Sequence, residues 1–384
     1  MSNFCRRPFT EINVEPDGTI SPCCLIKPAN VNDFNCRDLE SYKESPALKE
    51  LQRALLNDEK PAACEVCWNN EKCGIASLRA PEPSKYRIDE GKFREIHIKI
   101  SSICNYKCRM CGPFSSSAWL AEQRKFEMGM QDLMAAIPAE QTQFALKEPK
   151  FREEMFSVVI PNTQLIRVSG GEPLLCAHSL EFFKELVRRG LTNKHIFIYT
   201  NLSALSFAGV NYIEFWKQFP KLKLLVSCDG AGEHVEYSRT GLKWNEFLAN
   251  LEAVRDRVHS INCVINIYSV YSIPELVKTC QRMNLKVYLG SVFRKNMSVQ
   301  MLPLNEKSKI KEFYDEFVKR ETGVLPAEEL DYVYKTVLSY LFSEDDSQTN
   351  LPGVFKRKNE ELDRRRHTDF RRTFPQLSDW YASI

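Results

Sequence analysis

Three cysteines at short spacing form the most specific motif of the chain, Cys104-Asn-Tyr-Lys-Cys108-Arg-Met-Cys111. In a tight loop this spacing lets three thiolates bind three irons of one cubane cluster. The fourth iron then has no protein ligand and can chelate a second molecule. Short cysteine loops also bind zinc or an electron-transfer cluster with four cysteines, so spacing alone leaves both of these open.

A second group of cysteines lies in the first 73 residues, which hold seven of the fourteen: Cys5, Cys23, Cys24, Cys36, Cys64, Cys67 and Cys73. We expect a reducing compartment and no disulfide framework, so clustered thiolates indicate zinc or iron–sulfur ligation. Four cysteines stand singly in apolar surroundings, where we expect small buried core residues. They are Cys176, Cys228, Cys263 and Cys280.

Two further polar segments end predicted strands. The first is Val168-Ser169-Gly170-Gly171-Glu172-Pro173, and the second is Val226-Ser227-Cys228-Asp229-Gly230, followed by Arg239. We expect the two adjacent glycines to let backbone carbonyls approach a ligand, because no Cβ stands in the way. Taken singly, each segment is also typical of an ordinary turn after a strand.

The elements that position these motifs alternate between strand and helix from residue 93 onward. Strands are predicted around 96–100 and over 165–169, 195–200, 223–227, 263–270 and 286–293, with amphipathic helices between them. The pattern predicts a parallel sheet and a partial (β/α)6 barrel, whose chemistry lies at the carboxyl ends of its strands. A doubly wound sheet fits the same alternation, although no GxGxxG motif follows any strand.

Three parts are predicted along the chain of 384 residues. Residues 1–92 are rich in turn signals, show one helix at 39–56 and indicate a small metal-binding module with little core of its own. Residues 93–293 form the barrel, and residues 294–384 form a helical extension. In the extension, 356–372 reads as a basic surface helix, either a solvated face or a surface that steers an anionic substrate.

Composition limits the class of protein. Hydrophobic residues make up 43% and charged residues 27%, as in soluble globular proteins. No apolar run approaches the ~20 residues of a membrane span, and the N-terminus does not read as a secretory signal. We therefore expect a cytoplasmic protein with no membrane partner. The net charge of +3 is too small to indicate a nucleic-acid partner.

Taken together, the CxxxCxxC, GGEP and SxDG-x(8)-R segments resemble the radical S-adenosylmethionine (radical SAM) superfamily over about residues 93–293. The resemblance implies that Cys104, Cys108 and Cys111 bind a catalytic [4Fe–4S] cluster. It also implies S-adenosylmethionine contacts, which are assigned to Met110, Gly170, Gly171, Glu172, Pro173, Asn201, Ser227 and Arg239. Met110 departs from the aromatic residue that is usual there, and a polarisable thioether can replace it.

The N-terminal cysteines resemble a truncated SPASM motif, the twitch domain, which holds one auxiliary [4Fe–4S] cluster. By spacing, the implied ligands are Cys5, Cys23, Cys64 and Cys67, with Cys24 and Cys73 as rivals for two of these places. Most relatives carry this module after the barrel, whereas here it comes first. A structural zinc with four cysteines is the alternative.

The resemblance implies an oxidoreductase (dehydrogenase) or a rearrangement enzyme that takes an electron from a flavodoxin or ferredoxin. Reductive cleavage of S-adenosylmethionine would give a 5′-deoxyadenosyl radical, which takes hydrogen from a small-molecule or nucleotide-like substrate. The auxiliary cluster would accept an electron or bind substrate. The alternatives are an enzyme that modifies peptides or proteins and, in another class, a zinc-binding regulatory or RNA-binding protein. His97, on the first strand, is either a catalytic residue or a satisfied polar core residue.

Overall fold

The computed structural model describes all residues except 1–2, 27–35, 80–92, 127–144, 293 and 345–349. The chain divides into two compact units. The first unit contains residues 1–69, 77–107 and 111–225, and the second contains residues 70–76, 108–110 and 226–384.

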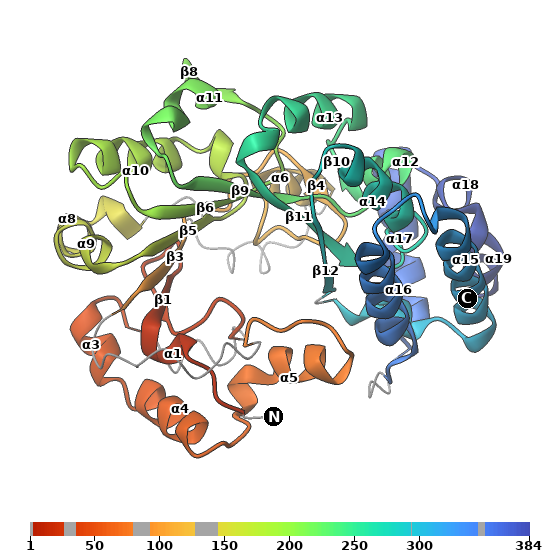
Figure 1. Cartoon of the computed structure of the whole chain (residues 1–384), viewed down its shortest axis with the longest axis horizontal. Coiled ribbons are helices and arrows are strands. Elements are labelled where there is room, and N and C mark those ends of the chain that lie inside the picture. Colours follow the sequence, from red (N-terminus) through yellow and green to blue (C-terminus); the bar gives the residue numbers. More distant parts are fainter. Residues whose placement is uncertain (1–2, 27–35, 80–92, 127–144, 293, 345–349) are drawn as a thin grey trace. The chain divides into compact units, whose positions relative to one another are not determined.

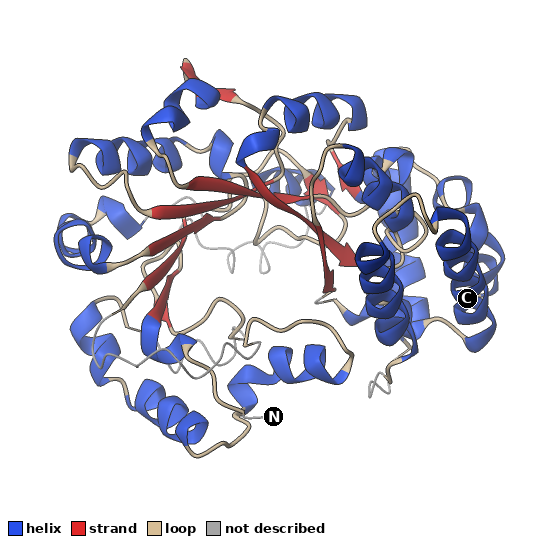
Figure 2. Cartoon of the chain, in the orientation of Figure 1, coloured by secondary structure: helices blue, strands red, loops and turns tan. Residues whose placement is uncertain are grey.

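Eight strands form one mostly parallel sheet in the order β12-β11-β9-β6-β5-β3-β1-β2, and helices connect successive parallel strands (Figures 1 and 2). Six of these strands make up the predicted partial barrel: β3 (Glu95–Lys99), β5 (Leu165–Ser169), β6 (His195–Thr200), β9 (Leu222–Ser227), β11 (Val258–Ile265) and β12 (Val287–Ser291). They follow one another in chain order without the reversal of a doubly wound sheet. The predicted α/β class is confirmed.

The N-terminal segment adds two strands that the sequence reading missed. Strand β1 (Glu11–Val14) pairs in parallel with β3, and β2 (Ile20–Ser21) pairs antiparallel with β1. Ile12 and Val14 are at most 1% exposed, so this segment shares the core of the sheet. The segment therefore contributes to the core of the sheet, which the prediction of a small separate module did not include.

Short helices make up the rest of the N-terminal segment: α1 (Arg7–Thr10), α3 (Leu39–Glu44), α4 (Pro46–Leu56), η2 (Ala62–Cys64) and α5 (Glu65–Lys72). The predicted helix over 39–56 is interrupted, since Ser45 is extended and Pro46 begins α4. A proline disfavours helical backbone at the residue before it, which explains the break.

Helices and turns connect the strands of the first unit. They are α6 (Ser117–Phe126), η4 (Ala145–Lys147), α8 (Pro149–Glu154), the π-helix η5 (Met155–Val159), α9 (Ile160–Asn162), η6 (Pro173–Leu175), α10 (Ala177–Arg188), α11 (Tyr212–Phe215) and η7 (Trp216–Gln218). Two further two-stranded sheets are formed by β7 (Ser206–Phe207) with β8 (Val210–Asn211), and by β4 (Lys107–Cys108) with β10 (Arg239–Thr240). Gly190, at φ +67°, follows the end of α10 in the left-handed conformation that glycine favours.

The second unit contains the remaining helices: α12 (Gly232–Ser238), α13 (Trp244–Ala253), η8 (Arg255–Arg257), α14 (Ile273–Arg282), η9 (Lys295–Met297), η10 (Val299–Met301), α15 (Leu304–Glu321), α16 (Ala327–Phe342), α17 (Leu351–Arg366), α18 (Phe370–Thr373), η11 (Pro375–Leu377) and α19 (Ser378–Ser383). Strand β11 ends at Ile265, five residues before its predicted end. The Asn266 side chain stops it by accepting from the backbone N–H of Tyr268 at 2.8 Å.

The basic segment 356–372 is not one helix. Helix α17 ends at Arg366, the following His367 adopts a left-handed conformation, and Phe370 begins α18. Phe355 and Leu362 of α17 are buried. Arg365 pairs with Glu361 one turn away, and the Arg365 side chain is 8% exposed.

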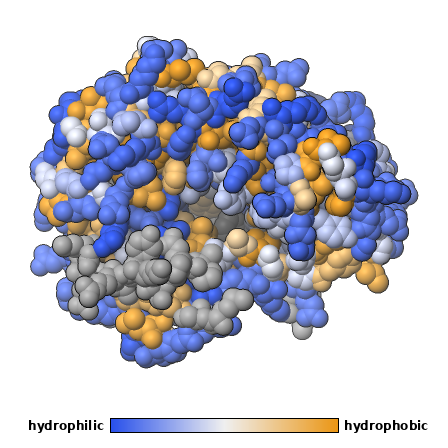
Figure 3. All heavy atoms as spheres, in the orientation of Figure 1, coloured by the Kyte–Doolittle hydropathy of each residue, from blue (hydrophilic) through white to orange (hydrophobic). Residues whose placement is uncertain are grey.

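Hydrophilic residues cover much of the visible face, and apolar residues appear in small groups (Figure 3). None of the helices among the described residues combines the length and the apolar composition that crossing a bilayer requires.

Candidate functional site

The loop after β3 carries Cys104, and the start of α6 fixes its backbone. Ser117 accepts from the Cys104 N–H at 3.1 Å and donates to the Cys104 carbonyl at 3.2 Å. The Ala118 N–H donates to the same carbonyl at 3.2 Å. The loop therefore has a defined conformation in the first unit, which also contains Cys111.

Burial raises the pKa of the Cys104 thiol to about 11, and nearby negative charge on Glu172 and Cys111 acts in the same direction. Without a positive partner this thiol therefore stays protonated at neutral pH. A metal centre would bind the thiolate and release the proton, because soft metals coordinate the deprotonated sulfur.

The GGEP segment lies directly against this loop. The backbone N–H groups of Gly171 and Glu172 donate to the carbonyls of Ser101 and Ile103, both at 2.7 Å. A Cβ at Gly170 would come within 2.5 Å of the Ser101 carbonyl oxygen, and one at Gly171 within 2.3 Å of that of Ile103. The glycines thus permit close approach to the chain's own backbone, which differs from the close approach to a ligand that we expected.

Glu172 is 1% exposed, and its carboxylate is held inside the first unit. It accepts from the Leu174 N–H at 2.9 Å, the Thr200 hydroxyl at 2.7 Å and the Asn201 N–H at 2.6 Å. Pro173, the first residue of η6, is buried beside it. The carboxylate therefore connects the GGEP segment to the end of β6.

Asn201 extends this connection to the cysteine loop. Its side-chain amide lies 3.8 Å from the Cys104 sulfur and donates to Asn105 Oδ1 at 3.1 Å. Its Oδ1 accepts from the Ser203 N–H at 2.9 Å. The Asn201 side chain, assigned above to S-adenosylmethionine, is thus hydrogen-bonded to the loop that carries Cys104.

The SxDG segment lies in the second unit. Arg239 donates through Nε to Asp229 Oδ2 at 2.7 Å, and Asp229 Oδ1 accepts from the Val264 N–H at 2.7 Å. Asp229 therefore orients the guanidinium of Arg239, which is assigned above to S-adenosylmethionine. Ser227 is the last residue of β9 and is half-buried.

The same unit contains Cys108 and Met110. Cys108 is 6% exposed, and the Met110 carbonyl accepts from Arg294 Nε at 3.2 Å. The motif thus contributes residues to both units, with Cys104 and Cys111 in one and the segment 108–110 in the other.

Four N-terminal cysteines line one cavity in the first unit: Cys5, Cys23, Cys64 and Cys67. Burial raises the pKa of Cys64 to about 12, and charge on Cys5 and Cys67 acts in the same direction. These four are the residues that spacing assigns to an auxiliary cluster, although they are up to 62 positions apart in the numbering from Cys5 to Cys67.

The two rival cysteines are placed differently. Cys24 is not among the cavity-lining residues, and proximity to Cys23 together with burial raises the pKa of its thiol, while nearby His97 acts in the opposite direction. Cys73 belongs to the second unit, where its sulfur accepts from Gln300 Nε2 at 3.6 Å. Both arrangements favour Cys23 and the CxxC pair as ligands.

A row of polar side chains crosses the first-unit sheet. In register, Asn13 of β1 pairs with His97 of β3, and Lys99 pairs with Ser169 of β5. His97 Nε2 is hydrogen-bonded to the Ser169 hydroxyl at 2.7 Å. Asn13 Oδ1 and His97 Nδ1 are buried with no hydrogen-bond partner among the described residues, and such atoms normally receive a water or a ligand.

Sequence reasoning found His97 and missed Asn13 and its neighbour Glu15, which pairs with Lys99 at 2.5 Å. The signal was present in Glu11-Ile-Asn-Val-Glu15, where polar and apolar residues alternate with the period of a strand.

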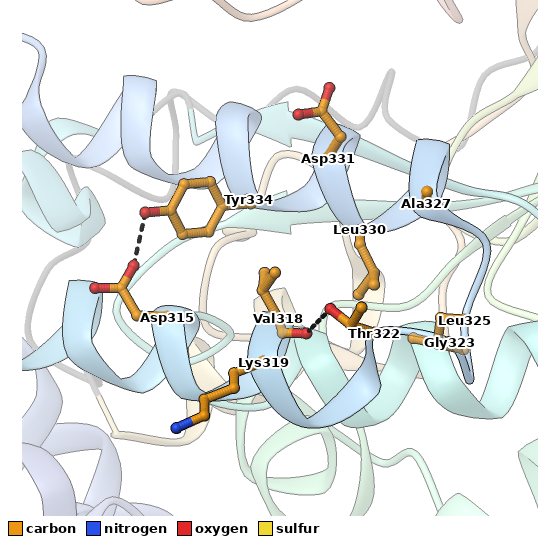
Figure 4. Close-up of a pocket in the computed structure, with 10 residues that line it drawn as sticks. All are labelled: Asp315, Val318, Lys319, Thr322, Gly323, Leu325, Ala327, Leu330, Asp331 and Tyr334. Atoms are coloured by element: carbon orange, nitrogen blue, oxygen red, sulfur yellow. Dashed lines mark hydrogen bonds between the residues drawn. The ribbon is translucent and has the colours of Figure 1, made fainter.

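A separate cavity of about 410 Å³ lies between α15 and α16 of the second unit (Figure 4). Val318 and Leu330 line it, and Tyr334 donates to Asp315 at 2.6 Å on its border. None of its lining residues belongs to the cysteine, GGEP or SxDG motifs. The size suits a small molecule, and the cavity lies apart from the residues that the sequence assigns to chemistry.

Comparison with known protein families decides the identification. Residues 98–278 match the radical SAM superfamily, which covers the cysteine loop, the GGEP segment and the SxDG segment. This part of the chain is a radical SAM domain. Residues 5–73 match the SPASM iron–sulfur cluster-binding domain, which therefore precedes the radical SAM domain.

Several solved structures are similar to this chain at low identity and low TM-score. SuiB from Streptococcus suis is 12% identical with a TM-score of 0.37, over 76% of this chain and 56% of that one. The same protein bound to S-adenosylmethionine matches over 73% and 59%. TYW1 with a lysine-pyruvate adduct is 16% identical with a TM-score of 0.34, over 70% and 81%. A comparison with curated proteins found no match.

The chain spans less than two thirds of the length of these first two SuiB structures. At such TM-scores the likeness carries no conclusion about the substrate of this radical SAM protein.

Membership in the superfamily implies a [4Fe–4S] cluster and S-adenosylmethionine, and the SPASM domain implies auxiliary cluster binding. The donors at both sites are thiols, which suit iron–sulfur clusters. Among the described residues, no three His, Cys, Asp or Glu side chains converge as ligands of a single ion would. Thiolates of a cubane bind separate irons and need not converge on one ion.

Proposed function

We propose that this radical SAM protein reductively cleaves S-adenosylmethionine and abstracts hydrogen from a polar small-molecule or nucleotide-like substrate. When bound, the reduced cluster and S-adenosylmethionine supply methionine and a 5′-deoxyadenosyl radical, which takes the hydrogen atom. The cofactor contributes this chemistry, and the protein contributes orientation and exclusion of water.

The observation that carries the proposal is the contact between the GGEP segment and the cysteine loop. Two backbone hydrogen bonds of 2.7 Å join them, and Asn201 connects the end of β6 to Cys104. These segments lie at the carboxyl ends of parallel strands, where barrel enzymes bind their substrates. Cys104, Cys108 and Cys111 would hold the cluster in this arrangement.

The S-adenosylmethionine contacts are proposed for the same strand ends. Gly170, Gly171, Glu172 and Pro173 would border the methionine, with Asn201 toward the ribose and Met110 toward the adenine. Ser227 and Arg239 would bind the carboxylate, with the guanidinium oriented by Asp229.

A polar substrate is favoured by the sheet face below these loops. Asn13, His97, Lys99 and Ser169 present hydrogen-bonding groups there, and two of their buried atoms have no partner among the described residues. A substrate with hydroxyl or amide groups would satisfy such atoms, whereas an apolar one would leave them unpaired. A peptide remains the alternative substrate.

The four cysteines Cys5, Cys23, Cys64 and Cys67 are proposed as ligands of one auxiliary [4Fe–4S] cluster. It would accept an electron from the substrate, which makes the reaction a net oxidation, or bind the substrate directly, which permits a rearrangement. A flavodoxin or ferredoxin is the proposed electron donor, and we propose that the protein works in the cytoplasm.

The test is anaerobic reconstitution with iron and sulfide, followed by dithionite and S-adenosylmethionine. We expect 5′-deoxyadenosine and methionine, because uncoupled cleavage needs no substrate. Cys108→Ala should abolish both products, since it removes one cluster ligand. Cys280→Ala, at a fully buried cysteine of α14, is the matched control and should retain cleavage. Undiminished cleavage by Cys108→Ala would refute the assignment.

A further inference from the structure

Arg109 stands inside the cysteine motif, between Cys108 and Met110, yet its side chain is 1% exposed. A buried arginine is costly, because its charge must be taken out of water and cannot be removed by deprotonation. We therefore expect the Arg109 guanidinium to have hydrogen-bond acceptors and a negative charge that compensate this cost.

Those partners come from the C-terminal extension, within the second unit. Nη1 donates to Asn359 Oδ1 at 2.7 Å, and Nη2 donates to Asp363 Oδ1 at 2.6 Å and to the Thr368 hydroxyl at 2.8 Å. Nε donates to the Tyr237 carbonyl at 3.2 Å, and the guanidinium carbon lies 3.7 Å from the centre of the Tyr237 ring. Every guanidinium nitrogen is thus engaged.

The acceptors are themselves held in place. Asp363 also accepts from the Tyr237 hydroxyl at 2.7 Å and from the Phe370 N–H at 2.9 Å. Asn359 is 1% exposed and donates to the Tyr237 hydroxyl at 2.9 Å. We call Arg109, Tyr237, Asn359, Asp363 and Thr368 the Arg109 network.

The backbone of the cysteine motif is joined to the same network. The Arg109 N–H donates to the Ser238 carbonyl at 2.8 Å, at the end of α12. Both the main chain and the side chain of Arg109 are therefore held by the second unit, and Cys108 and Met110 are its immediate neighbours. Any displacement of Arg109 must move at least one of these two residues.

We propose that Asn359 and Asp363 of α17 are positioning residues that hold the Cys108–Met110 segment in the conformation required for cluster binding. The C-terminal extension then helps to position the residues that bind the catalytic cluster. This inference rests on the proposed function of the cysteine loop, and it assigns α17 a role that its basic composition did not indicate.

The first experiment uses Asp363→Asn, which keeps the shape of the side chain but removes the charge that balances Arg109. The matched control is Asp331→Asn, which breaks a surface ion pair with Lys335 on α16. In apo protein, iodoacetamide labelling of Cys108, read by mass spectrometry, should be about tenfold or more faster in Asp363→Asn, because the segment opens more often. The control should label like the wild type.

The second readout is the cluster itself. After reconstitution, Asp363→Asn should lose most of the electron paramagnetic resonance signal that responds to S-adenosylmethionine, while retaining about four of about eight irons. Wild-type labelling and an undiminished signal in Asp363→Asn would overturn the inference. If the wild type itself shows no such signal, the proposed function fails, and Cys108 labelling still tests the positioning role.

A second variant separates positioning from general destabilisation. Arg109→Met combined with Asp363→Leu removes both charges and replaces a buried ion pair with apolar side chains, which proteins often tolerate. We expect a folded protein in which Cys108 still labels faster and the catalytic signal is reduced. Wild-type behaviour of this variant would show that packing alone holds the segment and would overturn the proposal.

Discussion

Asn201 combines two contacts that bear on the catalytic cysteine loop. Its backbone N–H binds the Glu172 carboxylate, and its side-chain amide lies 3.8 Å from the Cys104 sulfur. An N–H group directed at a ligating sulfur stabilises the more negative, reduced state of a cluster, so hydrogen bonds to sulfur raise its reduction potential.

We therefore expect Asn201→Leu to lower the potential of the catalytic cluster. A hydrogen bond worth about 1 kcal/mol corresponds to about 40 mV for a one-electron couple. Ser203→Ala is the control. The Ser203 hydroxyl donates to the same Asn105 Oδ1 at 3.2 Å, whereas the contact with the Cys104 sulfur comes from Asn201. A redox titration in the absence of S-adenosylmethionine, monitored by electron paramagnetic resonance, measures the reduction potential of the catalytic cluster in both variants. Equal potentials in the two variants would contradict this role.

At the residue scale, the sequence was most informative where a motif is local. The cysteine spacing and the GGEP segment are read within a few positions, and the comparison with known families confirms the superfamily they indicate. The role of Arg109 is not predictable from the sequence, because its partner Asp363 lies 254 positions away and no local pattern joins them. The close approach of Gly171 to the Ile103 backbone is not predictable either, because these two residues also lie far apart in the sequence.

At the scale of elements, strand β1 joins the iron–sulfur segment to the sheet. Ile12 pairs with Ile96 of β3 and is fully buried, so the N-terminal segment takes part in the core of the first unit. We expect Ile12→Ala to lower the free energy of unfolding by about 2–4 kcal/mol, through lost burial and the cavity left behind.

Urea denaturation of the apo protein under anaerobic conditions measures this loss. Leu56→Ala is the matched control, because Leu56 of α4 is 62% exposed and should change stability little. A loss no larger than that of the control would mean that β1 is not part of the cooperative core.

Elements with a clear pattern of apolar residues were predicted with the correct bounds. Element boundaries that depend on a single side chain were not. Strands β5 and β6 have the predicted bounds, because each alternates or clusters apolar residues between turn signals. The end of β11 was placed too late, since Asn266 interrupts an apolar run that reads as continuous strand. The helix at 39–56 was read as one, although Pro46 restarts it.

At the scale of the whole molecule, two cysteine sets predict two clusters that assemble independently. The triple variant Cys104→Ala, Cys108→Ala, Cys111→Ala should retain about four irons, because the N-terminal set remains intact. Cys64→Ala with Cys67→Ala should likewise retain about four irons, together with the signal that responds to S-adenosylmethionine. Iron and sulfide analysis after anaerobic reconstitution gives both numbers.

Zinc in place of iron in the triple variant would refute the auxiliary cluster, and loss of all iron in either variant would refute independent assembly. Cys263→Ala, at a buried cysteine of β11 outside both sets, is the control and should keep the wild-type iron content.

The order of β1 and β3 along the chain has a consequence for biosynthesis. Glu15, which follows β1, and its partner Lys99 at the end of β3 are 84 residues apart, so β1 leaves the ribosome well before its neighbour exists. At about 5–20 residues per second, this wait lasts roughly 4–17 seconds. During it, the apolar residues Ile12 and Val14 form an unpaired strand edge, a known site of misassembly. Slower translation of residues 16–99 should therefore lower the soluble yield of the nascent protein, unless a chaperone covers the edge.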